Sequence, residues 1–224
     1  LMLNRTRQLF VLQRTTLLIA IRAQLAEFGG VAGSGRKGVE VLLELIAKGE
    51  DERVPAAARV CHMALATQLQ LVKRQILEAD RRVLAWHRSS RTSKRLEAMP
   101  GVGPLVATAL VANIPDPSIF RSGRDMSAWI GLVPKQSSTG GKQKLGSISK
   151  AGNRYLRKLL VVGALSVIKR AKKLGYTKHP WLVRLMERRS TKIAAVALAN
   201  KIARMAWAMM TRNETYRTPL PQTA

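Results

Sequence analysis

The sequence predicts a mainly α-helical protein. Long amino-terminal helices resembling a coiled coil should precede a compact helical domain with a helix-hairpin-helix and a short β-hairpin or loop insertion. Aromatic residues make up only 4% of the chain, so its 46% apolar content is mostly Ala, Leu, Val and Ile, which favours packed helices over a β-sandwich. Apolar residues also recur every three or four positions, and Gly and Pro separate these segments.

Residues 1–92 are expected to form helices and a linker that hold domains or protomers apart. The first helix carries an apolar stripe of Leu9, Leu12, Thr16, Ile19, Ala23 and Ala26. A Gly/Ser-rich connector, a short helix near residues 39–48 and a long helix from Pro55 to about Ser89 follow. Arginines interrupt the first segment, so we expect no membrane span and no signal peptide. No capping residue precedes this helix, which predicts a fragment of a longer protein.

Residues 93–212 are predicted to form the compact domain, and residues 213–224 a flexible tail. The domain begins with SKRLEAMPGVGPLVATALVANI over residues 93–114, in which a Pro-Gly-Val-Gly turn joins two apolar helices. Gly101 and Gly103 allow backbone conformations closed to other residues, and free amides at the start of the second helix can meet a phosphate. This pattern indicates a helix-hairpin-helix, with an ordinary helical hairpin as the alternative.

Besides a basic link and short helix within residues 176–189, three further helices are expected in this domain. The first is a short helix before Leu132, with Trp129 in the core. The second runs from Arg154 towards Lys173. The third covers residues 191–211 and is apolar on nearly all sides, which predicts a central core helix in which Asn200 makes a buried hydrogen bond.

The stretch PKQSSTGGKQKLGSISKAGNRYLR (residues 134–157) lies in a strongly basic region. No Asp or Glu occurs between Asp125 and Glu187, whereas thirteen Lys or Arg do, and residues 121–224 hold 22 Lys or Arg against 3 acidic residues. A surface of one sign repels itself unless a polyanion compensates it, so nucleic acid is the expected partner. Cations at the start of a helix also oppose the helix dipole, which an anion bound there would offset. Solvated surface charge is the alternative.

The chain offers few groups for catalysis. It has no Cys/His cluster and no paired carboxylates near the basic half, which argues against a metal site within the chain. Its single cysteine, Cys61, excludes an internal disulfide. Ser137 and Ser138 are expected within a glycine-flanked Ser-Ser-Thr-Gly-Gly turn. A serine needs an activating base or metal, however, and none lies nearby in the sequence. From the residues alone, this turn either contacts phosphates or carries a nucleophile.

Three segments carry a resemblance to a known family: LEAMPGVGPLVATAL, FRSGRDMSAWIGLVPKQSSTGGKQKLGSISKAGNRYLRKLL and AVALANKIARMAWAMM. Together they closely resemble the carboxy-terminal domain of IS-110-type insertion-sequence transposases. The match is collinear over essentially the whole chain. It implies a DNA recombinase in which an amino-terminal RuvC-like domain holds metal on four carboxylates, while a carboxy-terminal serine becomes covalently attached to DNA. It also implies a structured guide RNA.

Carried onto this sequence, the family serine falls on Ser138, with Ser137 as the fallback. Glycines next to the serine would let the backbone approach DNA closely, and cations would neutralise phosphates. The expected DNA-binding residues are Gly101, Gly103, Arg121, Arg124, Lys135, Gly140, Gly141, Lys142, Lys144, Lys150, Asn153, Arg154 and Arg157.

The chain departs from this family in one respect. No Asp or Glu occurs before Glu27, so the carboxylates of the RuvC-like domain are missing from this sequence, and Mg²⁺ is expected only through that domain. Without those carboxylates the chain alone is expected to bind nucleic acid but not to cut it, and catalysis would require a partner that supplies them. The resemblance implies DNA and a guide RNA as partners. The long helices predict a homo-oligomer, and no membrane partner is expected. The single cysteine suits a reducing compartment, so a bacterial cytoplasmic location is expected. The alternative function is a non-catalytic helix-hairpin-helix binding module or an inactive transposase remnant.

Overall fold

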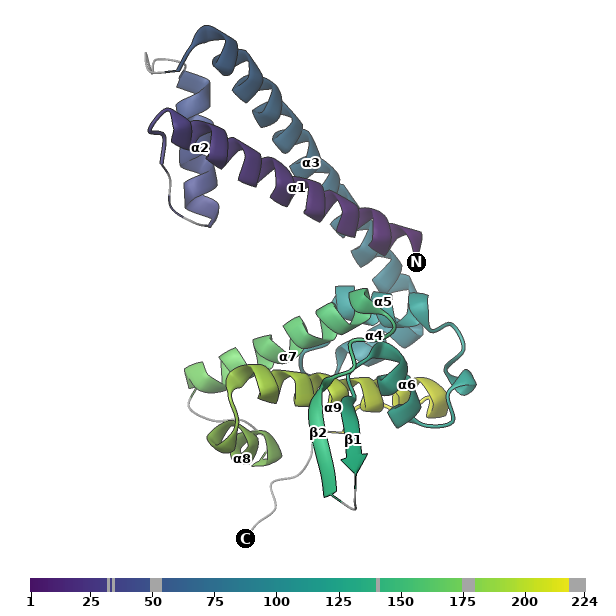
Figure 1. Ribbon diagram of the computed structural model, residues 1–224. Coiled ribbons are helices and arrows are strands. Elements are labelled where there is room, and N and C mark those ends of the chain that lie inside the picture. The colour runs from purple at the N-terminus through teal and green to yellow at the C-terminus, as the bar shows by residue number, and fades with distance from the viewer. Residues whose placement is uncertain (32, 34, 49–53, 140–141, 175–179, 218–224) are drawn as a thin grey trace. The chain divides into compact units, whose positions relative to one another are not determined.

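The computed structural model describes residues 1–31, 33, 35–48, 54–139, 142–174 and 180–217 of the chain. It contains two compact units, Leu1–Val83 and Leu84–Ala224. The described ranges hold nine α-helices, one short 3-10 helix and one two-stranded sheet (Figure 1). The prediction of a mainly α-helical fold is therefore confirmed.

The Leu1–Val83 unit contains α1 (Met2–Glu27), α2 (Arg36–Lys48) and most of α3 (Ala56–Ser89). An ion pair joins Arg7 of α1 to Asp80 of α3. The three helices share a small apolar core. It consists of Ile21, Leu25, Val39, Ile46, Ala66 and Leu69.

The apolar stripe predicted for α1 is not its buried face. Leu9, Leu12 and Ile19 are 53%, 54% and 64% exposed, whereas Ile21 and Leu25 are buried. The helix is only weakly amphipathic, because apolar residues lie on more than one of its faces. Packing against α2 and α3 decides which face is covered, and the spacing within α1 could not show this.

The central helix of the Leu84–Ala224 unit is α9 (Thr191–Arg212), which packs alongside α7 (Arg154–Leu174). Fully buried alanines on α9, such as Ala195 and Ala199, keep the side-chain layer thin and let neighbouring helices approach closely. The other helices of this unit are α4 (Arg91–Glu97), α5 (Pro104–Asn113), η1 (Pro117–Ile119), α6 (Gly123–Ile130) and α8 (Pro180–Arg188).

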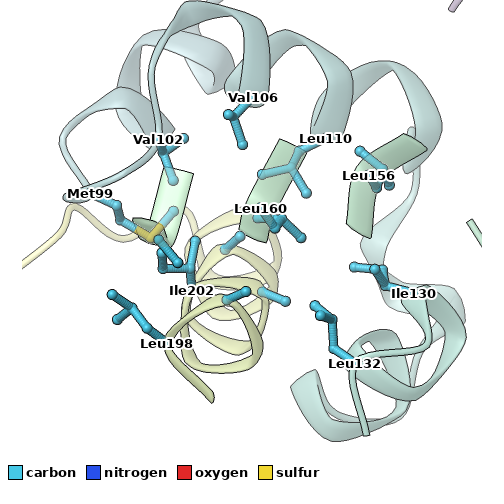
Figure 2. Close-up of a cluster of buried hydrophobic side chains, with 14 of the residues drawn as sticks. Met99, Val102, Val106, Leu110, Ile130, Leu132, Leu156, Leu160, Leu198 and Ile202 are labelled. Carbon is cyan, nitrogen blue, oxygen red and sulfur yellow. The ribbon is translucent and has the colours of Figure 1, made fainter. Parts of the chain in front are cut away.

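Side chains from four helices meet in one apolar cluster (Figure 2). Leu110 of α5, Ile130 of α6, Leu160 of α7 and Ile202 of α9 each have no exposed surface. The helix before the basic stretch and the helix after it are therefore fixed in the same core.

One face of α9 points away from this core. Ile193 is 52% exposed, and Val196 is partly exposed, whereas Leu198 and Ile202 on the other face are buried. The prediction that α9 is a central core helix is confirmed, although this apolar face is exposed. The predicted hydrogen bond of Asn200 is confirmed, although the residue is only partly buried: its Nδ2 donates to the Leu132 carbonyl oxygen at 3.2 Å.

Trp129 does not lie in the core as predicted. It is 40% exposed, with its ring against Phe120 at a centroid distance of 5.5 Å. The buried face of α6 is set by Met126 and Ile130, which are four residues apart and so share one side of the helix. Trp129 falls beside that face.

Two of the described helices, α1 and α9, are long and apolar enough to cross a membrane by length and composition alone. The arginines of the first segment therefore do not by themselves exclude a span, and the expectation of no membrane span stays a prediction. Core helices of soluble proteins pass the same test, and half of the apolar window of α9 is buried within the protein.

Candidate nucleic-acid interface

The basic stretch forms an antiparallel hairpin of β1 (Pro134–Thr139) and β2 (Lys142–Ile148). A bulge interrupts the register between Pro134 and Gln136, where β2 has one residue more than β1. The hairpin extends from the helical body as an arm (Figure 1). From Pro134 to Ser137, every residue is exposed, so this strand is not packed into the apolar core.

The predicted nucleophile lies in this arm. Ser138 belongs to β1 and pairs with Gln143, and Ser137 pairs with Lys144. The Ser-Ser-Thr part of the expected turn is therefore strand. Gly140 and Gly141 lie outside the described residues, as do the side chains of Ser138, Lys142 and Lys144.

Backbone contacts fix the base of the hairpin to the end of α6. The Ser149 amide donates to the Val133 carbonyl oxygen at 2.9 Å, and the Lys150 amide donates to the Gly131 carbonyl oxygen at 3.2 Å. Gly152 has a φ of +74°, and a Cβ there would lie 1.7 Å from the Trp129 carbonyl oxygen. Only glycine fits this close approach, so the Ser-Lys-Ala-Gly segment holds the arm in place.

Two predicted DNA-binding residues have internal partners here. Asn153 caps α7 by accepting from the Leu156 amide at 3.0 Å, and its Nδ2 donates to Asn113 Oδ1 at 2.9 Å. The Nη1 of Arg157 donates to the carbonyl oxygens of Ile130 and Ala151 at 2.7 and 2.9 Å. These contacts tie α7 to α5, to α6 and to the hairpin base. A phosphate contact by either residue stays a prediction.

Other predicted cations are free to face solvent. Lys135 lies on β1, Lys150 at the hairpin base and Arg154 in the first turn of α7, and all three are exposed. Arg121 and Arg124 are exposed near the start of α6. The structure thus brings Lys150 and Arg154 to the root of the arm that carries Ser138.

The predicted helix-hairpin-helix is formed by α4, a turn and α5. Gly101 in this turn packs against Gly163 in the middle of α7, and Gly103 precedes α5 without a side-chain cap. Gly163 follows Arg154 by nine residues, which is about 14 Å along α7. The close packing explains why residue 101 is glycine, while phosphate binding at this turn stays a prediction.

A groove of about 1430 Å³ lies along the outer face of α9. One end is bordered by the hairpin base, including Pro134 and Gly146, and Ile193 and Val196 contribute to an apolar floor. None of the residues that line it is acidic. Its charged residues are Arg124, Arg189, Lys192, Lys201 and Arg204.

The sequence interpretation included Arg124 but missed the other four cations of this groove. They lie beyond Glu187, where the acid-free interval ends, and α9 is predicted as a core helix and not as a ligand-binding one. A usable signal was present: Lys201 and Arg204 are three residues apart, so they interrupt one side of an otherwise apolar helix.

A buried Ser–His–Glu cluster joins α3 to α4. His87 Nδ1 lies 2.7 Å from Ser93 Oγ, and His87 Nε2 lies 2.9 Å from Glu97 Oε2. A carboxylate can only accept, so Nε2 carries the hydrogen in this pair. The arrangement resembles a hydrolase triad, but Ser93 has no exposed surface and cannot reach a substrate. The cluster is a structural clamp.

Replacing His87 with Ala is expected to lower the free energy of unfolding by about 1–3 kcal/mol, because the Ser93 hydroxyl would lose its buried partner. Urea unfolding followed by circular dichroism measures this change. Glu97→Gln is the matched control: Glu97 is 46% exposed on its side chain, and glutamine keeps an acceptor. If His87→Ala were as stable as the native chain, the Ser–His–Glu cluster would not stabilise the contact between α3 and α4.

Shifted pKa values occur away from the hairpin. Hydrogen bonds from the Ser118 hydroxyl and amide lower the pKa of Asp116, and burial raises the pKa of Tyr216. Among the residues that the structure describes, no group of three or more His, Cys, Asp or Glu could hold a metal ion. These residues therefore do not fit a carboxylate metal centre.

Comparison with known proteins gives concordant results. Residues 93–179 match the family described as Transposase IS116/IS110/IS902. The chain is 44% identical over 97% of its length to the transposase-named protein y4pF/y4sB of Sinorhizobium fredii. It is 38% identical over 96% of its length to the transposase for insertion sequence element IS1111A of Coxiella burnetii. It is 32% identical, also over 96%, to the transposase for element IS1328 of Yersinia enterocolitica.

The chain spans 56%, 59% and 63% of the lengths of these three relatives. The family match covers the α4–α5 hairpin, α6, the β-hairpin and α7, which are the elements that hold Ser138 and the exposed cations around it. Residues 93–179 of the chain therefore form a domain of the transposase IS116/IS110/IS902 family.

Proposed function

We propose that the chain binds DNA and supplies the nucleophilic serine, Ser138, of a DNA transposase. The observation that carries this proposal is the position of Ser138 on an exposed hairpin arm whose root bears Lys150 and Arg154. The acid-free surroundings favour a phosphodiester there. The family relationship supports transposition as the overall reaction.

The proposed step is a phosphoryl transfer to serine. The Ser138 Oγ attacks the phosphorus of a DNA phosphodiester and forms a serine–phosphate ester. The bond from phosphorus to one sugar oxygen breaks, and that oxygen leaves as a hydroxyl carrying the proton that serine gives up. A hydroxyl end of another strand then attacks the ester and releases the serine, so the number of phosphodiester bonds is conserved.

The anchoring of the hairpin supports this chemistry. Arg157 ties α7 to the end of α6 and to Ala151 in the segment after β2, and Asn153 ties the start of α7 to Asn113 of α5, so the segment that follows the arm is fixed to the helical body. A nucleophile held in place loses less freedom when the substrate binds, which lowers the barrier. Arg157 and Asn153 are therefore positioning residues in this proposal.

The family resemblance adds other components to the proposal. Mg²⁺ would be bound by a RuvC-like domain and would supply the activation that a serine hydroxyl needs to act as a nucleophile. A structured guide RNA and a second copy of the protein are proposed partners, in the bacterial cytoplasm.

Replacing Ser138 with Ala is expected to abolish the covalent protein–DNA adduct, with a loss of at least about a hundredfold, because alanine has no nucleophilic oxygen. The test uses a protein of the relatives' full length that contains this chain and a labelled DNA duplex. Denaturing gels then detect the adduct. Ser137→Ala is the matched control, since successive strand positions belong to opposite faces of a ribbon. An adduct that persists in Ser138→Ala refutes the assignment, and its loss in Ser137→Ala alone moves the nucleophile to Ser137.

The second candidate function is a non-catalytic binding module that uses the α4–α5 hairpin and the β-hairpin as a clamp. The uncapped start of α5 after Gly103 favours it, since free amides there can accept a phosphate. This function predicts DNA binding without an adduct under any condition, so the same gels separate the two candidates.

A further inference from the structure

We propose that the groove along α9 binds a single-stranded segment of DNA. Its phosphates would meet the cationic walls and its bases the apolar floor. The groove is separate from the serine arm, and the choice of DNA over other polyanions rests on the proposed function.

Charge is the first argument. The groove has five cations and no acidic lining residue. Lys192 and Lys201 are nine residues apart on α9, which places them on opposite sides of the helix and so along the two edges of the groove. Arg204 lies between these edges. A strand lying along the floor would therefore meet cations on both sides.

The uncharged lining is the second argument. Trp181 is 37% exposed at one wall, and the Lys201 ammonium lies 4.7 Å from its ring centroid. Ile193 is 52% exposed on the floor. A duplex keeps its bases inside and offers only phosphates, whereas an unpaired strand also offers base faces that stack on aromatic and apolar groups. The mixed lining thus matches a single strand.

Dimensions and position are the third argument. The lining runs along α9 from Lys192 to Ala208, which is about 24 Å and would accommodate about seven nucleotides at the rise of a stacked strand. One end of the groove meets Pro134, and Ser138 follows four residues later, about 13 Å along β1. A strand leaving the groove would therefore point towards the arm that carries the serine.

The test measures fluorescence anisotropy of the 224-residue chain with a labelled single strand of about 12 nucleotides. The groove variant is Lys192→Gln, Lys201→Gln and Arg204→Gln together. It is expected to bind at least about tenfold more weakly, and its log–log salt slope should fall by about 0.7 for each lost phosphate contact. The control variant is Lys169→Gln, Arg170→Gln and Lys173→Gln on α7. It makes the same charge change at exposed positions outside the groove and should stay within about threefold of the native affinity.

Stacking is tested separately at Trp181. Trp181→Ala is expected to weaken single-strand binding about tenfold or more, whereas Trp181→Phe keeps a ring and should restore most of the affinity. Thermal melting of each variant identifies any loss of folding. A folded Trp181→Ala that binds like the native chain would overturn the stacking role.

Three results would overturn the proposal as a whole: unchanged binding by the groove variant, an equal loss in the α7 control, or an equal loss for a duplex of the same sequence. If an RNA strand of the same sequence bound more tightly than the DNA strand, the groove would be assigned to RNA instead. Displacement by poly-glutamate as readily as by unlabelled DNA would assign it to an acidic protein. None of these measurements requires DNA cleavage, so they test binding in the groove independently of whether Ser138 forms a covalent adduct.

Discussion

Replacing Gly163 with Ala is expected to destabilise the Leu84–Ala224 unit by about 3 kcal/mol or more, although alanine is the better helix former by about 1 kcal/mol. A Cβ at this position of α7 would lie 2.0 Å from the Gly101 carbonyl oxygen, which is backbone and cannot rotate away. The α4–α5 turn would have to move off α7 and open the apolar core beneath it. Urea unfolding should show the lost free energy.

Gly103→Ala is the matched control in the same turn. A Cβ there would have no atom within 4 Å, and the backbone at Gly103 is extended. The expected cost is below about 1 kcal/mol, the size of a weakened helix cap. If Gly163→Ala were as stable as Gly103→Ala, the close contact between α7 and the α4–α5 turn would be refuted.

The elements that the sequence predicts well are those whose signals are local. The hairpin, the beginning of α7 and the turn at Gly101 each follow from Gly and Pro placement and from apolar spacing within a few residues. Leu156 and Leu160, expected on the apolar side of α7, are indeed fully buried. Local geometry determines these features, so local patterns predict them.

The errors come from contacts between distant segments. Trp129 is apolar but lies beside the face that Met126 and Ile130 bury, and Ile193 lies on an apolar helix at a side that no other helix covers. Which face of a helix is buried depends on its neighbours in space. A repeat within one helix cannot provide that information when the helix has apolar residues on several faces.

The candidate site shows the same limit. Sequence patterns group Lys150, Arg154 and Arg157 as equivalent cations, but the Arg157 side chain donates to two carbonyl oxygens, one of them 27 residues away at Ile130. A guanidinium with five donors suits a cluster of carbonyl oxygens as well as it suits a phosphate. Charge alone therefore cannot separate a ligand-binding arginine from an anchoring one.

Salt should weaken duplex DNA binding steeply. If the chain neutralises six to ten phosphates, raising the salt from about 50 to about 200 mM should reduce affinity about 10³- to 10⁵-fold, since each neutralised phosphate releases condensed counterions. Fluorescence anisotropy with a labelled duplex at several salt concentrations gives the salt slope, which is the change in the logarithm of the binding constant with the logarithm of the salt concentration. The triple variant Lys135→Gln, Lys150→Gln and Arg154→Gln removes exposed cations at the arm, so its slope should fall by about 0.9 for each lost contact.

Arg157→Gln provides the contrast to this triple variant. Its two carbonyl hydrogen bonds, at 2.7 and 2.9 Å, hold the hairpin base, so its loss is expected to lower the free energy of unfolding by about 1.5–3 kcal/mol. Its salt slope should match that of the native chain, because the partly exposed Arg157 guanidinium already donates to two carbonyl oxygens of the protein. A slope reduced by about one unit with unchanged stability would instead make Arg157 a phosphate ligand. Equal slopes for the triple variant and the native chain would remove the arm from the DNA-binding surface.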